Sequence, residues 1–189
     1  MTENDIARLI EGCRKGDRKS QEALYRNYYG KMLTVCKRYF RDIDQARDVA
    51  QEGFFKVFTN LEKYNGKGAF EGWMRRIMVN MCIDRHRKSQ NDFVLLSEDY
   101  SMDTFGDVVE EEETDDHYDF TPEQVMAAME SLTPAYRTIF NLYIFENLQH
   151  KEIAEKLGIS VGTSKSNLAK AKRNLKRVLL TEAYKKDHG

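Results

Sequence analysis

The feature that most constrains the fold of this chain is a strongly acidic segment between two basic halves. Residues 91–119 contain 12 Asp and Glu residues and no Lys or Arg. Residues 1–90 hold 19 Lys and Arg against 12 Asp and Glu, and residues 120–189 hold 11 against 7, so the net charge of −1 conceals the asymmetry. Such a segment repels itself and carries too little apolar surface to fold alone. The chain is therefore predicted to form a domain over 1–90, an acidic flexible linker over 91–121 and a second domain over 122–189.

Apolar residues recur at helical spacing on both sides of this segment, and no stretch alternates in the manner of a strand. The chain has only two prolines, and 32% of its residues are charged, a composition that favours helices. We therefore predict an all-α fold of two small helical domains with four helices in each. In the first domain the helices are expected from Ile6 to Cys13, from Ser20 to about Phe40, from Asp42 or Asp44 to about Asn60, and from Phe70 to Arg87. In the second domain Thr133 is expected to cap a helix that begins at Pro134, and Asn147 to close it.

Residues 149–173 have the pattern of two helices joined by a tight turn. The first helix has one apolar face and ends at Gly158, which can adopt a left-handed backbone conformation. Ser160 can cap the second helix, which carries six Lys and Arg residues, and no acid occurs between 160 and 181. This pattern is typical of a helix-turn-helix, whose second helix enters the major groove while its cations bind phosphates. It also fits a two-helix hairpin with a solvated basic face, and the motif alone leaves both interpretations open.

The sequence argues against several other classes of protein. Cys13, Cys36 and Cys82 fit neither a disulfide framework nor a zinc site, and we expect them in the core. No apolar run is long enough to cross a membrane, and residues 1–14 do not have the pattern of a signal peptide. The four histidines are scattered, and no catalytic or metal-binding motif occurs. We therefore expect a cytoplasmic protein that is not an enzyme, does not insert into a membrane and needs neither metal nor cofactor.

Taken together, several stretches resemble the sigma-70 family of RNA polymerase sigma factors, in its compact extracytoplasmic-function (ECF) type. These stretches are Ala46–Phe58, Phe70–Ile77, Asn80, Asp84 and Arg87 in the first domain, and Leu132–Pro134, Glu152–Ala154 and Val161–Thr163 in the second. Many bacterial regulators share the helix-turn-helix, whereas both halves in this order are specific to the family. The resemblance implies a sigma factor that directs promoter recognition, promoter melting and transcription initiation.

The roles of family positions carry over to the matching residues. The first domain, sigma region 2, would bind a coiled coil in the largest subunit of core RNA polymerase through Asp48, Gln51, Glu52 and Phe55. It would bind the promoter −10 element through Asn65, Lys67, Phe70, Trp73, Arg75, Arg76, Asn80 and Arg87, with the loop 65–69 forming a pocket for a flipped base. The second domain, sigma region 4, would bind the −35 element through Thr163, Lys165, Ser166, Asn167, Lys170 and Arg173. An anti-sigma factor is a further partner that the resemblance implies.

Several of these assignments have structural alternatives. Phe70 and Trp73 lie three residues apart on one helix face, so they can pack in the core instead of stacking on a base. Asn80 can bond a neighbouring turn instead of DNA. In the second helix of the helix-turn-helix, Lys165 and Asn167 stand where the family often has arginine. Lysine lacks the bidentate fork that arginine offers to guanine, so the −35 sequence cannot be transferred from relatives.

The competing function is a stand-alone transcriptional regulator that uses only the helix-turn-helix, with the first half for dimerisation or sensing. Such a protein would bind duplex DNA without RNA polymerase, as a dimer on two half-sites. A sigma factor should instead be monomeric and should bind promoters well only together with core RNA polymerase.

Overall fold

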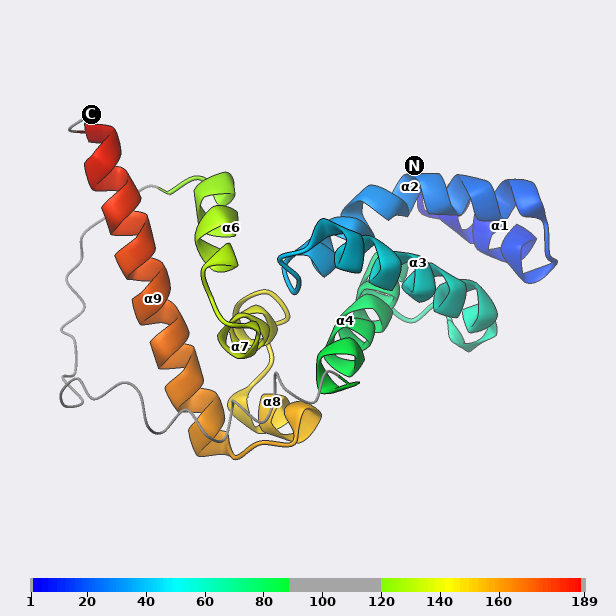
Figure 1. The fold of residues 1–189 in the computed structure, drawn as a ribbon. Helices are drawn as coiled ribbons and strands as arrows, with labels where there is room; N and C mark the ends of the chain where they lie inside the picture. Colours follow the sequence, from blue (N-terminus) through cyan, green and yellow to red (C-terminus); the bar gives the residue numbers. More distant parts are fainter. Residues whose placement is uncertain (1, 89–119, 188–189) are drawn as a thin grey trace. The chain divides into compact units, whose positions relative to one another are not determined.

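The computed structural model describes residues 2–88 and 120–187, and every regular element within them is a helix (Figure 1). The chain divides into two compact units, residues 1–85 and residues 86–189. The predicted all-α fold is therefore confirmed for the described residues. The acidic linker predicted over 91–121 lies outside them, apart from its last two residues. None of the described helices is both long and apolar enough to span a membrane.

The first unit is built from short helices with defined starts. Its elements are α1 (Glu3–Arg14), α2 (Arg18–Lys37), α3 (Ile43–Thr59), the 3-10 turn η1 (Leu61–Lys63) and α4 (Phe70–Lys88). Thr2, Asp17 and Asp42 cap the first three helices, because each side chain accepts hydrogen bonds from backbone N–H groups of the first turn. The expected start of α2 at Ser20 is wrong. Asp17 begins the helix earlier, and the Ser20 hydroxyl donates a hydrogen bond to that carboxylate at 2.6 Å.

The core of the first unit lies between these helices. Its packing determines which faces of α3 and α4 point to solvent. α2 packs against both α1 and α3. It also meets the start of α4, where the rings of Tyr28 and Phe70 lie edge to face with centroids 5.8 Å apart. α3 and α4 meet at Gly53, where the Met78 side chain occupies the space that a Cβ would need. The three cysteines are buried, as predicted.

The second unit is organised along one long helix. Its elements are α6 (Pro122–Glu130), α7 (Pro134–Ile144), α8 (His150–Leu157) and α9 (Val161–Asp187). The three shorter helices each pack against α9 (Figure 1). Thr133 caps α7, with Pro134 as the first helical residue, as the sequence predicts. Asn147, the residue expected to close this helix, has a left-handed backbone three residues after its end.

A buried arginine joins α6 to α7 in this unit. Arg137 is 3% exposed, and its guanidinium donates to the carbonyl oxygens of Met129 at 3.0 Å, Glu130 at 2.8 Å and Leu132 at 3.1 Å. The last carbonyls of a helix have no partner within it, and a cation also interacts favourably with the helix dipole there. The guanidinium therefore satisfies the end of α6 and fixes its angle to α7, which supports the helix-turn-helix that follows.

Candidate nucleic-acid and protein interfaces

The outer face of α3 presents one exposed aromatic side chain among polar ones. Asp48, Gln51, Glu52 and Phe55 follow the spacing of a single helix face, and all four are exposed. Phe55 is 70% exposed, while Val49 on the opposite face is fully buried. Exposed aromatic groups rimmed by polar residues are typical of protein-binding surfaces. The face thus has the composition of a docking surface, and we call these four residues the α3 face.

One member of the α3 face is paired with the end of α4. The Glu52 carboxylate accepts a hydrogen bond from Arg85 at 2.7 Å, and both side chains are about half exposed. An ion pair at this exposure contributes little to stability, about 0–1 kcal/mol. It does place a positive charge from the basic end of α4 beside the α3 face.

The loop between η1 and α4 is shaped by two glycines. Gly66 and Gly68 have φ angles of 75° and 82°, a region that other residues rarely adopt. The Asn65 side chain accepts a hydrogen bond from the Lys67 backbone N–H at 3.0 Å. The Tyr64 hydroxyl donates to the Gly68 carbonyl oxygen at 2.8 Å and so joins the two ends of the loop. We call residues 65–69 the glycine loop, whose Asn65 and Lys67 are exposed as a DNA contact requires.

Aromatic side chains from both ends of the glycine loop pack against one another. The Tyr64 ring lies 5.0 Å from Phe70 and 5.5 Å from Trp73, and the rings of Phe70 and Trp73 stack at 5.6 Å. Phe70 is only 4% exposed, so it packs in the core, which was the structural alternative, and its contact with DNA remains a prediction. Its position at the first turn of α4 directs it into the core against α2. Trp73 is half-buried, which leaves both packing and contact with a base open to it.

A surface cavity of about 670 Å³ opens beside the glycine loop. Tyr64, Asn65 and Gly68 form one wall, α1 forms another, and Tyr28 contributes from α2. Its volume is within the range of small-molecule and base-sized sites. Sequence reasoning missed the contributions of α1 and Tyr28, because they lie far from the loop along the chain. The position of Tyr64 directly before the glycines was the one available signal.

The exposed face of α4 is polar and basic. Arg76, Asn80 and Arg87 are exposed and repeat at intervals of four and seven residues, which places them along one side of the helix. Arg75 is half-buried. The glycine loop and α4 thus expose Asn65, Lys67, Arg76, Asn80 and Arg87, and the role of these residues in DNA binding remains a prediction.

The second unit contains the predicted helix-turn-helix in α8 and α9. Gly158 ends α8 with a left-handed backbone at φ 70°, and its N–H donates to the Ala154 carbonyl oxygen at 2.9 Å. Ser160 caps α9 by accepting a hydrogen bond from the Thr163 N–H at 2.9 Å. Gln149 precedes α8, and its N–H donates to the Glu152 carboxylate at 2.8 Å. Local signals alone determine this turn, and for that reason the sequence predicted it.

The interior stripe of α9 includes two polar residues. Ser164 is fully buried and Asn167 is 6% exposed, next to the buried Leu168 and Ala171. Asn167 therefore packs inside the second unit, and its contact with a DNA groove remains a prediction. Positions 164, 167, 168 and 171 repeat at intervals of three and four, so one face of the helix carries all of them toward α8 and α7.

The other −35 candidates lie nearer the surface of α9. Lys165, Ser166 and Arg173 are exposed, and Thr163 and Lys170 are half-buried. The first turns of α9 thus offer two hydroxyl groups and the start of a row of cations. Hydrogen-bond donors at the N-terminus of such a helix suit base edges, and the cations farther along it suit phosphates.

A histidine links α8 to α9 beside these cations. His150 Nδ1 lies 2.9 Å from the Ser164 hydroxyl oxygen, and its ring stacks on Tyr143 at a centroid distance of 4.8 Å. Burial, and then the positive charges of Lys165 and Lys172, hold the pKa of His150 below its usual value. The folded helix-turn-helix therefore favours the neutral form of the His150 ring.

Comparison with known proteins finds a family match in each half of the chain. Residues 24–91 match the family model for sigma-70 region 2, and residues 123–175 match the family model for sigma-70 region 4. The chain belongs to the sigma-70 family. The two matches cover most of this sigma factor, and the region 2 match begins inside α2, after α1.

Two relatives of this sigma factor are of similar length to it. It is 28% identical to the ECF RNA polymerase sigma factor SigW of Bacillus subtilis, over 92% of this chain and 96% of that protein. It is also 28% identical to the RNA polymerase sigma-H factor of Pseudomonas aeruginosa, over 95% of this chain and 96% of that protein. A solved complex of the sigma factor RpoE with the anti-sigma factor NepR from Bartonella quintana aligns with a TM-score of 0.49 and 15% identity, over 84% of this chain and 95% of that one. The two family-model matches and the sigma-factor relatives show that the protein is an RNA polymerase sigma factor of the ECF type that acts in transcription initiation.

Proposed function

We propose that the first unit of this sigma factor binds core RNA polymerase and the −10 element, and that the second unit binds the −35 element. The observation that carries the proposal is the glycine loop, which lies beside a cavity of about 670 Å³ with an aromatic wall. The exposed cations of α4 begin a few residues farther along the chain. A flipped base needs a pocket, and the strand that carries it needs positive charge along its path.

Promoter melting by a protein without ATPase chemistry depends on binding energy. Flipping a base out of the stack costs a few kcal/mol. Stacking on an aromatic ring returns about 1–3 kcal/mol per base. Tyr64 and Trp73 are the partly exposed rings beside the glycine loop, and they are our candidates for that stacking. Asn65, Asn80 and Arg76 supply hydrogen bonds around it.

The α3 face is our candidate for the docking site of the polymerase. Phe55 is the aromatic anchor, because its side chain is 70% exposed and its burial in an interface would remove a large apolar area from water. Asp48 and Glu52 add negative charge at its rim, which selects a basic partner surface. We propose the coiled coil of the largest polymerase subunit as that partner, as the family resemblance implies.

The second unit would discriminate the −35 element through Thr163, Lys165, Ser166 and Lys170, with Arg173 on phosphate. Because the two units are covalently joined, binding of one raises the effective concentration of the other at its own element. The catalytic chemistry belongs to the polymerase, and we infer that the protein acts in the cytoplasm, where that enzyme works. An anti-sigma factor is an additional partner in this proposal.

The division of labour between the units is tested by paired substitutions in the holoenzyme. Promoters selected for initiation are changed by single bases at the −10 or the −35 element, and the initiation rates of variants are compared. Asn65→Ala should reduce discrimination at −10 about tenfold and leave −35 discrimination unchanged. Lys165→Ala should do the reverse. Arg26→Ala, which removes an exposed cation of α2 paired with Glu22, is the control and should change neither.

The outcome that contradicts the proposal is a loss of discrimination at the wrong element. If Lys165→Ala changed preference at −10 and Asn65→Ala changed it at −35, the assignment of the units would be reversed. If neither variant changed either preference, the glycine loop and α9 would not read the promoter.

A further inference from the structure

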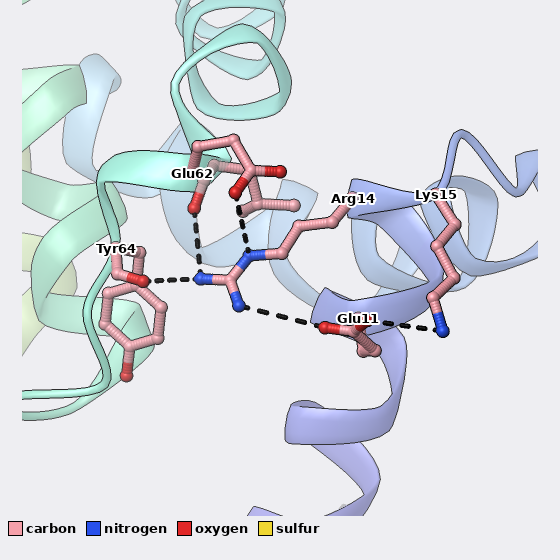
Figure 2. Close-up of polar contacts among 6 residues, drawn as sticks. Glu11, Arg14, Lys15, Glu62 and Tyr64 are labelled. Carbon is pink, nitrogen blue, oxygen red and sulfur yellow. Dashed lines mark hydrogen bonds and ion pairs between the residues drawn. The ribbon is translucent and has the colours of Figure 1, made fainter.

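Arg14 joins the end of α1 to the residues directly before the glycine loop. Arg14 lies in the last turn of α1, and its Nη2 donates to the Tyr64 carbonyl oxygen at 2.6 Å and to the Leu61 carbonyl oxygen at 3.4 Å (Figure 2). Its Nε lies 3.9 Å from the Glu62 carboxylate, and its Nη1 lies 3.9 Å from Glu11 of its own helix. The guanidinium therefore holds η1 and the residue directly before the glycine loop.

Tyr64 extends the restraint from Arg14 into the glycine loop. Arg14 fixes the Tyr64 carbonyl oxygen, and the Tyr64 hydroxyl donates to the Gly68 carbonyl oxygen at 2.8 Å. The Tyr64 ring also packs on Phe70 and Trp73 at the start of α4. Any shift of the Tyr64 backbone would therefore move both ends of the glycine loop. With two glycines in five residues, the loop has many backbone conformations to choose from once this restraint is lost.

The surroundings of Arg14 argue against a direct contact with DNA phosphate. Its side chain is 29% exposed, and its donors point at backbone carbonyls and carboxylates. The carboxylates of Glu11 and Glu62 each lie 3.9 Å from the guanidinium and compete with a phosphate for it. Because the side chain is committed to the protein and stands among acids, an effect of Arg14 on promoter binding must pass through the loop.

We propose that Arg14 is a positioning residue, which holds the glycine loop in one conformation and thereby sets its discrimination between −10 bases. The inference rests on the proposed function, in which this loop binds the −10 element. It extends the −10 site to α1, which precedes the part of the chain that matches sigma-70 region 2. A guanidinium is suited to the role because its planar fork can donate to two carbonyl oxygens at once, which a lysine ammonium does not match in geometry.

The test compares three variants in the reconstituted holoenzyme on promoters that differ by single bases in the −10 element. Arg14→Gln should lower discrimination at −10 about tenfold while −35 discrimination and core polymerase affinity stay unchanged. Arg14→Lys should give an intermediate loss. Lys15→Gln is the matched control, because Lys15 is the neighbouring cation and pairs only with Glu11 among the ion pairs of the described residues. It should behave like the unaltered protein.

Hydrogen exchange of the glycine-loop amides in the free protein gives a second readout, which a general loss of stability would not reproduce. Exchange should quicken at residues 65–69 in Arg14→Gln, with no change in the core of α2 and α3. The inference is overturned if initiation falls equally at all −10 sequences, if the whole first unit exchanges faster, or if Arg14→Gln behaves like Lys15→Gln.

Failure of the inference and failure of the proposed function can be told apart by Asn65→Ala. If Asn65→Ala lowers −10 discrimination and Arg14→Gln does not, the loop reads the promoter without help from Arg14. If neither variant lowers it, the −10 site itself is misplaced.

Discussion

Replacing Asn167 by leucine should stabilise the second unit without loss of promoter binding. Asn167 is 6% exposed, and its Nδ2 finds no hydrogen-bond partner among the described residues. A buried polar group left unsatisfied costs about 1–3 kcal/mol. Leucine has similar length and branching, so Asn167→Leu should remove this cost with little change in shape and add apolar contact with Leu168 and Ala171. We expect a gain of about 1–2 kcal/mol in the free energy of unfolding.

The gain can be assigned to one unit because the chain has a single tryptophan, Trp73, in the first unit. For a domain of this size, 1 kcal/mol corresponds to a shift of about 4–8 °C in melting temperature. Asn167→Leu should therefore raise the transition seen by far-UV circular dichroism and leave the Trp73 fluorescence transition in place. In the holoenzyme its −35 discrimination should match the unaltered protein, whereas Lys165→Ala should lose about tenfold. The reasoning is refuted if the folded Asn167→Leu variant loses −35 discrimination as Lys165→Ala does, because Asn167 would then face the groove.

Two further predictions concern packing and pH. Gly53→Ala should destabilise the first unit by about 1–3 kcal/mol, because the new methyl group meets the buried Met78 side chain. Gly30→Ala, which has open space around it, should stabilise the unit by about 0.5–1 kcal/mol. Equal effects of the two variants on the free energy of unfolding in denaturant would contradict this prediction. The folded-state pKa of His150 lies below its unfolded value, so its contribution to stability should be complete above about pH 6.5 and should decline as pH falls below that. His150→Gln should flatten this dependence in melting experiments on the second unit, and an unchanged slope would show that other groups cause it.

Local signals in the sequence predicted the helices and their ends well. The cap of α7 at Thr133, the turn at Gly158 and the start of α9 at Ser160 each depend on a few adjacent residues, and all are present in the structure. Two starts were misplaced, since α1 begins at Glu3 instead of Ile6 and α2 at Arg18 instead of Ser20, in each case after an earlier capping residue. Asp17 is also a good capping residue, and the sequence alone did not rank it against Ser20.

Side-chain orientation was harder to predict because it depends on packing. Polarity suggested that Asn167 faces DNA, but the interior stripe of α9 carries it inward with Ser164. Phe70 was expected at the promoter, and α2 buries it instead. The hold of Arg14 on Tyr64 joins residues fifty positions apart, and no local pattern reveals such a contact.

The role of this chain as an adaptor for RNA polymerase is tested most directly by initiation in a purified system. Core RNA polymerase is mixed with this protein and a promoter library, and transcripts are measured with and without the protein. We predict initiation from a defined promoter class only when the protein is present, and weaker assembly with core polymerase, by about tenfold, in Phe55→Ala. No initiation from any promoter, together with tight binding of the protein alone to duplex DNA, would contradict the account.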